Sequence, residues 1–317
     1  MFRKPQFDAV GGWGAKPTSV KARSLAARTG TPYISLEDGW IRSLRAGPSE
    51  APLSVVVDTV GTHYDATAPC QLEKLVATAA RRTTGLSRAG RAMDLLREEA
   101  ISKYNAAPRL SLRRMGLTAT PVGGRVLVVD QTMGDASIAG GLASAETFNE
   151  MLAAARTENP EAEILVKTHP EVTDGRKKGY LSGASGPGIR LFSDAVNPWS
   201  LFDAVDRVYV VSSQLGFEAL MAGLPVTCFG APYYAGWGLT DDRVTLARRT
   251  ARPNLEQLFA ALYFDYAHYV SPSGETITFE DAVAHLVDIR DRTFGHSRRR
   301  PAGLPIPESV AAGYAAA

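Results

Sequence analysis

One stretch in the second half of the chain, RVYVVSSQLGFEALMAGLPVTCFGAPYYAGWGLTDD at residues 207–242, constrains the fold most strongly. It begins with the apolar run 208–211, which is typical of a buried strand, and continues through the polar pair Ser212 and Ser213. Apolar residues at helical spacing follow, and a second apolar run, 226–229, begins after a Gly-Leu-Pro turn. The pattern predicts a strand, a loop, a helix and a second strand, which together form the βαβ unit of a parallel sheet.

The loop at Ser212 and Ser213 lies where such folds bind ligands. In open parallel sheets, ligands bind outside the carboxyl ends of the strands, and the first turn of the next helix offers free N–H groups to an anion such as phosphate. Glu218, early in the predicted helix, is placed to accept hydrogen bonds from a sugar hydroxyl. The segment therefore favours a site for a phosphorylated ligand that also carries hydroxyl groups.

Composition narrows the class of protein. A length of 317 residues suggests two domains, and 45% hydrophobic with 21% charged residues is an ordinary globular composition. The net charge of +2 gives no reason to propose nucleic acid as a partner. Neither the G-x-x-x-x-G-K-S/T pattern nor G-x-G-x-x-G occurs in the sequence. Their absence argues against P-loop phosphate chemistry and against a dinucleotide-binding half.

The sequence also points to a cytoplasmic location. The two cysteines, Cys70 and Cys228, have no metal-binding neighbours in the sequence, as expected of a reduced protein. The first residues lack the apolar region of a signal peptide, and no apolar run reaches the roughly 18 residues that a membrane span needs. We therefore expect any association with a membrane to be peripheral.

Strand-like and helix-like segments alternate in both halves of the chain. Apolar runs predict strands at 7–11, 33–36, 53–57, 125–129, 163–167 and 208–211, and helical spacing predicts helices at 19–29, 72–82, 90–104, 145–159, 197–203, 255–266 and 279–293. Residues 105–122 have weak periodicity and are expected to link two domains, and the Gly- and Ser-rich segment 173–188 is expected to be a mobile loop. The pattern predicts an α/β protein with two doubly wound domains facing across a cleft. We place the domains at 1–118 and 119–295, with a tail at 296–317.

Polar side chains with catalytic character recur where the predicted strands end. They are Glu37, Asp38, Asp58, Asp130, Asp135, Lys167, His169, Ser212 and Ser213. Any one of them alone is more typical of a helix cap or a turn. Strand exits of a parallel sheet converge on one edge, and two such edges facing each other can hold a donor and an acceptor substrate.

The segment Lys167-Thr168-His169-Pro170 is one candidate for leaving-group chemistry. Pro170 disfavours the α conformation at His169 and ends the strand there, which projects the imidazole into the cleft. A His and a Lys at this place suit a phosphate leaving group. The alternative is a structural histidine in a tight turn.

Asp135 is the candidate for chemistry on a sugar. It lies in a Gly-Asp-Ala-Ser loop whose small residues let a ligand approach the carboxylate closely. A transferred sugar passes through an oxocarbenium-like state, which a carboxylate can stabilise or attack. The alternative is an Asp N-cap for a helix that starts at Ala136.

The segment Glu37-Asp38-Gly39-Trp40 with Arg42 is expected on the opposite side of the cleft. Glu37 is a candidate general base for an acceptor hydroxyl, and Arg42 is a candidate for binding a carboxylate in bidentate fashion. The alternative is a surface turn with an Arg–Asp pair.

Several long motifs occur in one order along the chain. They are EDGWIRS at 37–43, SKYN at 102–105, DQTMGDASI at 130–138, EILVKTHPE at 163–171 and VSSQLGFEALMAGLPVTCFGAPYYAGWGLT at 211–240. In these motifs the chain resembles the capsule polysaccharide β-Kdo transferases of the KpsC/LipB type. Members of that family carry two such modules in tandem, whereas this chain holds one.

The resemblance implies a GT-B-like fold of two Rossmann-like domains, with CMP-β-Kdo as the donor substrate. It implies retention of configuration without a catalytic metal or another cofactor. Carried over by motif, Asp135 is the nucleophile at the anomeric carbon, His169 lies beside it, and Glu37 is the acid/base on the acceptor side. The family often has a second acidic residue before Asp-Ala-Ser, where this chain has Gly134.

The resemblance also implies binding partners. The CMP moiety is expected to contact Lys167, His169, Pro170, Ser212, Ser213 and Glu218. Arg42 is expected to bind a carboxylate of Kdo or of the acceptor, which is a Kdo-terminated glycolipid. The implied function is to extend the oligo-Kdo linker of a capsular polysaccharide at the inner face of the cytoplasmic membrane, beside a second Kdo transferase module. The alternatives are a nucleotide-sugar epimerase or hydrolase on the same fold and a catalytically silent scaffold of capsule assembly.

Overall fold

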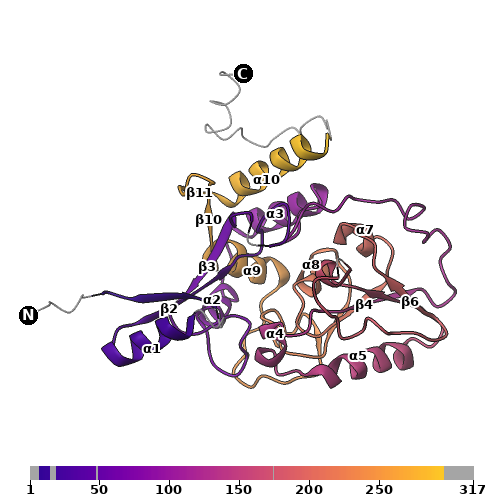
Figure 1. Ribbon diagram of the computed structural model, residues 1–317, viewed down its shortest axis with the longest axis horizontal. Coiled ribbons are helices and arrows are strands. Elements are labelled where there is room, and N and C mark those ends of the chain that lie inside the picture. Colours follow the sequence, from indigo (N-terminus) through magenta and orange to yellow (C-terminus); the bar gives the residue numbers. More distant parts are fainter. Residues whose placement is uncertain (1–6, 15–18, 48, 174, 296–317) are drawn as a thin grey trace, which may run out of the picture.

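The structure is a computed structural model that describes residues 7–14, 19–47, 49–173 and 175–295. Its strands form two separate sheets, one of five and one of six strands. Each sheet is covered by helices, and Figure 1 shows the second sheet between α5 (Ala145–Glu158) and α7 (Pro198–Phe202).

The second sheet is parallel throughout. Its strands are β4 (Arg125–Val129), β5 (Glu163–Lys167), β6 (Ile189–Phe192), β7 (Arg207–Val210), β8 (Val226–Cys228) and β9 (Asp241–Asp242). They lie in the order β6-β5-β4-β7-β8-β9, and all five ladders are parallel. This is the doubly wound order in which the direction of winding reverses between β4 and β7. The prediction of a doubly wound domain in the second half is confirmed.

Local sequence explains this half well. The continuous apolar run of β4 is buried at every position, as expected of a strand with helices on both faces. Ser144 caps α5 through a capping box with Thr147. The remaining helices are short: α4 (Ala136–Gly140), α6 (Pro170–Thr173) and α8 (Leu215–Met221). Each of them follows the carboxyl end of a strand, and the loops between these strands and helices form one edge of the sheet.

The first sheet departs from the expected doubly wound topology. Its strands are β1 (Val10–Trp13), β2 (Tyr33–Asp38), β3 (Ser54–Asp58), β10 (Ala267–Val270) and β11 (Thr276–Ile277), in the order β1-β2-β3-β10-β11. Only β1 and β2 are parallel, and the other three pairs are antiparallel. The reason lies in the connections. The described residues between β2 and β3, 39–47 and 49–53, contain no crossover helix, and parallel pairing needs a crossover.

The end of the described chain returns to the first half. Figure 1 shows β10 and β11, near the yellow end of the colour bar, beside the indigo strands β2 and β3. The helices α1 (Ser19–Thr29), α2 (Gln71–Ala79), α3 (Leu86–Glu98), α9 (Leu255–Ala260), the π-helical turn η1 (Ala261–Tyr266) and α10 (Phe279–Phe294) complete this half. Arg88 in α3 pairs with Glu280 in α10 at 2.9 Å. Assigning all of 119–295 to the second domain is therefore wrong for the strands at 267–277.

The aromatic residues of the Ala-Pro-Tyr-Tyr-Ala-Gly-Trp segment join the two halves. The ring of Tyr233 lies 4.3 Å from that of Trp40, and Trp40 Nε1 donates to the carbonyl of Leu262 at 2.7 Å. Tyr234 Oη donates to the carbonyl of Ser213. A Cβ atom at Gly216 would lie 2.1 Å from that hydroxyl, so only glycine fits there. These aromatics fix the orientation of one half against the other.

No helix in the described ranges combines the length and apolar character needed to cross a bilayer. The linker expected at 105–122 contains no helix or strand. The tail at 296–317 lies outside the described residues.

Candidate functional site

The reversal of strand order between β4 and β7 marks the candidate ligand site. In doubly wound sheets, ligands bind in the crevice outside the carboxyl ends of the strands at this point. The loops that begin there carry Asp130, Gln131, Ser212 and Ser213, and His169 follows the end of the neighbouring β5. The structure thus brings together most of the polar residues that the sequence places at strand exits.

A triangle of polar side chains spans the two strands at the reversal. Gln131 Nε2 donates to Ser212 Oγ at 3.1 Å, and Gln131 Oε1 accepts from the Ser212 amide at 3.0 Å. Ser137, in the first turn of α4, lies with its Oγ 3.0 Å from Ser212 Oγ. Gln131 and Ser137 both belong to the motif at 130–138, but no sequence signal distinguishes them from its other residues.

Asp135 is the N-cap of α4 and is exposed. Its Oδ1 accepts a hydrogen bond from the Ser137 amide at 2.9 Å. The predicted roles of Asp135 as an N-cap and as a nucleophile are compatible, because an N-cap uses one carboxylate oxygen and holds the group in one orientation. The other oxygen is available to a ligand, and the role as nucleophile stays a prediction.

His169 lies close enough to Asp135 for the two to interact electrostatically. Burial lowers the pKa of His169, an effect that Glu171 and Asp135 oppose and that Lys177 and Lys167 reinforce. The imidazole is thus neutral at pH 7. Its Nδ1 accepts from the Glu171 amide at 3.2 Å, so the ring hydrogen is on Nε2. His169 can therefore donate one hydrogen bond to a ligand oxygen.

Lys167 is buried at the end of β5. Its Nζ donates to the carbonyls of Thr168 at 2.9 Å and Asp194 at 3.3 Å. Burial lowers its pKa to about 8, and the Asp194 carboxylate partly opposes this shift. The ammonium ties two strand-exit loops together, and its expected contact with CMP stays a prediction.

The segment 173–188, expected to be mobile, is anchored by a buried carboxylate. Asp130 Oδ1 accepts from the amides of Gln131, Tyr180 and Leu181 at 2.9 to 3.1 Å. A Cβ at Gly179 would lie 2.1 Å from Asp130 Oδ2, so glycine is required where the loop crosses this oxygen. Burial raises the pKa of Asp130, and the three amide hydrogen bonds oppose the shift. The sequence placed Asp130 at a strand exit but did not reveal this partner.

Glu218 lies on α8 at the contact between the two halves. Both of its oxygens accept from Ser102 Oγ at 2.8 Å, and Gln214 Nε2 donates to Oε1 at 3.0 Å. The side chain is buried, and burial raises its pKa to about 7. Ser213, by contrast, is half-buried, and its Oγ accepts from the Leu215 amide. The expected contacts of Glu218 and Ser213 with CMP stay predictions.

The raised pKa of Glu218 predicts a pH-dependent stability. The carboxylic acid form is favoured in the folded state, so its stabilising contribution is complete below pH 4.5 and is lost as the pH rises through about 7. The free energy of unfolding of Glu218→Gln relative to the wild type should therefore increase by about 3 kcal/mol between pH 4.5 and pH 8. Urea unfolding at several pH values measures the difference. The exposed Glu150→Gln is the control, and a pH-independent difference for Glu218→Gln would contradict the prediction.

Glu37 lies in the first half and is linked to the Asp135 side by one loop. Tyr64 Oη donates to Glu37 Oε1 at 2.9 Å. Two residues later, the Ala66 amide donates to the carbonyl of Gly140, at the end of α4, at 2.7 Å. The loop that orients Glu37 thus touches the helix that Asp135 caps, and the role of Glu37 as acid/base stays a prediction.

Arg42 is buried and bonded within its own segment. Its Nε pairs with Asp38 Oδ2 at 2.9 Å, and its Nη1 donates to Ser43 Oγ at 2.8 Å. The Arg–Asp pair expected as the alternative is therefore present. Binding of a substrate carboxylate by Arg42 stays a prediction.

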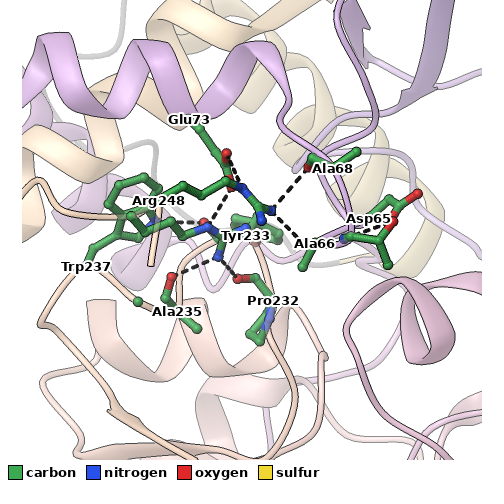
Figure 2. Close-up of polar contacts among 12 residues, drawn as sticks. Asp65, Ala66, Ala68, Glu73, Pro232, Tyr233, Ala235, Trp237 and Arg248 are labelled. Carbon is green, nitrogen blue, oxygen red and sulfur yellow. Dashed lines mark hydrogen bonds and ion pairs between the residues drawn. The ribbon is translucent and has the colours of Figure 1, made fainter. Parts of the chain in front are cut away.

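An ion-pair network beside the site connects α2 to the chain after β9. Figure 2 shows Arg248 between Glu73 and the carbonyls of Ala66 and Ala68. The neighbouring Arg249 binds the other oxygen of Glu73 at 2.8 Å. The network holds the 64–68 loop, and with it the Glu37 side of the site, against the second half.

Within the described ranges, no three His, Cys, Asp or Glu side chains are grouped as ligands of a metal ion. Metal-independent chemistry stays an expectation from the resemblance. The ligand groups that the site offers are a carboxylate at Asp135, a neutral imidazole at His169 and hydroxyl groups at Ser137 and Ser213.

Fold and site together define a two-lobed α/β protein with a ligand site at the switch point of its parallel sheet. The model of the family described as "Capsule polysaccharide biosynthesis protein" matches residues 8–115 and 116–271. The chain belongs to this family. The expected α/β, GT-B-like class of two lobes is confirmed.

Curated relatives include the capsule polysaccharide modification protein LipA of Neisseria meningitidis serogroup B. It is 44% identical over 297 residues, which cover 89% of this chain and 42% of LipA. The lipopolysaccharide-processing protein LpsZ of Rhizobium meliloti is 39% identical over 280 residues, covering 86% of this chain and 62% of LpsZ. The chain thus spans less than two thirds of the length of either relative.

Two solved structures from Thermosulfurimonas dismutans KpsC are similar over most of the chain. The first, a beta Kdo 2,4 transferase, is 46% identical with a TM-score of 0.83 and covers 88% of this chain and 87% of its own. The second, a beta Kdo 2,7 transferase, is 33% identical with a TM-score of 0.65 and covers 89% and 85%. The resemblance to the KpsC/LipB type is confirmed.

Proposed function

We propose that the protein is a retaining β-Kdo transferase that uses CMP-β-Kdo to extend the oligo-Kdo linker of a capsular polysaccharide glycolipid. The main support is the similarity to the KpsC beta Kdo 2,4 transferase over nearly all of both chains. The exposed carboxylate of Asp135, the neutral His169 and the switch-point loops are consistent with a sugar-nucleotide site.

The proposed reaction has two displacements. Asp135 attacks the anomeric carbon, the bond to the phosphate oxygen breaks, and CMP leaves with a hydrogen bond from His169 Nε2. Glu37 then takes the proton of an acceptor hydroxyl, whose oxygen displaces Asp135 from the anomeric carbon. Two inversions give net retention, and none of the steps uses a metal ion.

Similarity favours one linkage over the other. The 2,4 transferase exceeds the 2,7 transferase in both identity, 46% against 33%, and TM-score, 0.83 against 0.65. With a defined Kdo-terminated acceptor, we therefore expect NMR of the product to show a β-2,4 linkage. A 2,7-linked product would refute this specificity while leaving Kdo transfer intact.

We also propose a working context for the protein. Because the match spans 42% of LipA, we propose that the protein acts beside a second Kdo transferase module. We place it in the cytoplasm, peripherally bound at the inner membrane face where its glycolipid acceptor is anchored.

One assay separates this proposal from its alternatives. Without a Kdo-terminated acceptor, incubation with CMP-Kdo should release at most one CMP per protein molecule, as the covalent intermediate forms, and repeated turnover should need the acceptor. Repeated turnover without an acceptor would favour a hydrolase or epimerase. A catalytically silent scaffold would release none in either case, and capsule formation would survive Asp135→Ala.

A further inference from the structure

Three hydrogen-bonded side chains lead from the sheet toward the ligand side of the site. Gln131 follows β4, Ser212 follows β7, and Ser137 lies in the first turn of α4. Gln131 and Ser212 are buried, whereas Ser137 is half-buried and lies two residues beyond the exposed Asp135. Because the Ser137 amide donates to Asp135 Oδ1 at 2.9 Å, the two residues lie in the same turn at the start of α4.

The direction of these hydrogen bonds follows from the donors available. Gln131 Oε1 accepts from the Ser212 amide, which can only donate, so the Nε2 group of Gln131 donates to Ser212 Oγ. Ser212 Oγ lies 3.0 Å from Ser137 Oγ, where either hydroxyl can donate, and 3.4 Å from Gln131 Oε1, which can only accept. When the Ser212 hydrogen points to the nearer Ser137 Oγ, that oxygen accepts, and the Ser137 hydrogen can turn to a ligand.

The backbone of α4, which carries the Ser137 hydroxyl, is held by hydrogen bonds from two other segments. The carbonyls of Gly140 and Gly141, at the end of α4, accept from the amides of Ala66 and Ala231, both at 2.7 Å. A Cβ at Gly141 would lie 2.6 Å from the Ser137 carbonyl, so the turn after α4 has no room for a side chain. A preorganised donor loses little entropy when a ligand binds.

We propose that Ser137 is a direct ligand contact that donates its hydroxyl hydrogen to an anionic oxygen of the sugar-nucleotide donor. CMP-Kdo carries two anionic groups of this kind, the phosphate of its CMP moiety and the carboxylate of its sugar. The oxygens of both groups are stronger hydrogen-bond acceptors than a neutral hydroxyl. The identity of the donor rests on the proposed function, whereas the orientation of the hydroxyl rests on the hydrogen bonds of this chain.

The test compares binding of CMP and CMP-Kdo by calorimetry with kcat/KM for Kdo transfer. Ser137→Ala should weaken binding by about 10- to 100-fold, the usual effect of losing a hydrogen bond to a charged group. Ser137→Thr keeps the hydroxyl and should restore binding. Weaker binding of CMP as well as CMP-Kdo assigns the contact to the phosphate, and weaker binding of CMP-Kdo alone assigns it to the carboxylate. If Ser137→Ala unfolds at a clearly lower temperature than the wild type, Ser137→Cys replaces it in the binding measurements. Its thiol has a similar size but is a weak donor, so binding should again be weaker.

The outcomes separate this inference from the proposed function. A Ser137→Ala protein that binds both ligands as tightly as the wild type overturns the inference, even if the wild type transfers Kdo. Weaker binding by Ser137→Ala, in a wild type that binds CMP-Kdo without transferring it, supports the inference and overturns the transferase. A wild type that binds neither CMP nor CMP-Kdo overturns both.

Discussion

Asp135→Asn should lower kcat for Kdo transfer by about 10³-fold or more while leaving the fold intact. An amide cannot attack the anomeric carbon as a carboxylate does, so the first displacement is lost. Asn is as good an N-cap as Asp, and its side-chain oxygen can still accept from the Ser137 amide. The substitution therefore removes the nucleophile without removing the cap.

The comparison with Asp135→Ala separates chemistry from folding. Ala loses the cap as well, so its free energy of unfolding should fall by a further ~1 kcal/mol, whereas its activity should match that of Asn. In the wild type, mass spectrometry without an acceptor should detect Kdo attached to the peptide that contains Asp135. An Asn variant with near wild-type activity, or a product of inverted configuration, would contradict the double displacement.

The second sheet could be predicted from the sequence because its signals are local. The predicted strands 125–129 and 163–167 have the same bounds as β4 and β5, since both are short apolar runs with turn residues around them. The strands β10 and β11 have no such signal. They are short and half-polar, and β10 pairs with β3 across about two hundred residues of sequence. Pairing over such a distance leaves no local pattern to read.

The candidate site was predictable as a set of strand exits but not as a set of partners. Asp135, His169 and Ser212 lie on loops or turns that follow the neighbouring parallel strands β4, β5 and β7. Sequence reveals the chemical type of a side chain, however, and not which neighbour uses it. Glu218 and Arg42 look available for a ligand, yet in the structure their polar atoms bind Ser102, Gln214, Asp38 and Ser43. For the same reason, the sequence does not indicate Gln131 and Ser137. Their hydrogen bonds with Ser212 exist only because β4, β7 and α4 come together in the fold.

Arg249→Ala should lower the free energy of unfolding by about 3 to 5 kcal/mol, because it breaks a buried ion pair. Arg249 is 3% exposed, and its Nη1 donates to the carbonyls of Pro232 and Ala235 at 2.6 and 2.8 Å. Its guanidinium also lies 5.4 Å from the ring centroid of Trp237. Its removal leaves two carbonyls and one oxygen of Glu73 without their donor.

Arg248→Ala is the matched control, because Arg248 binds the same carboxylate from the next position in the chain (Figure 2). Its side chain is 30% exposed, so water can replace the lost contacts and the cost should be about 1 kcal/mol. Urea unfolding of the two variants measures the contrast. Equal losses would mean that Glu73 is held by charge alone. A larger loss for Arg249→Ala would show that the buried guanidinium joins the aromatic segment 231–237 to α2, and thereby fixes the lobe that carries Glu37 against the lobe that carries Asp135.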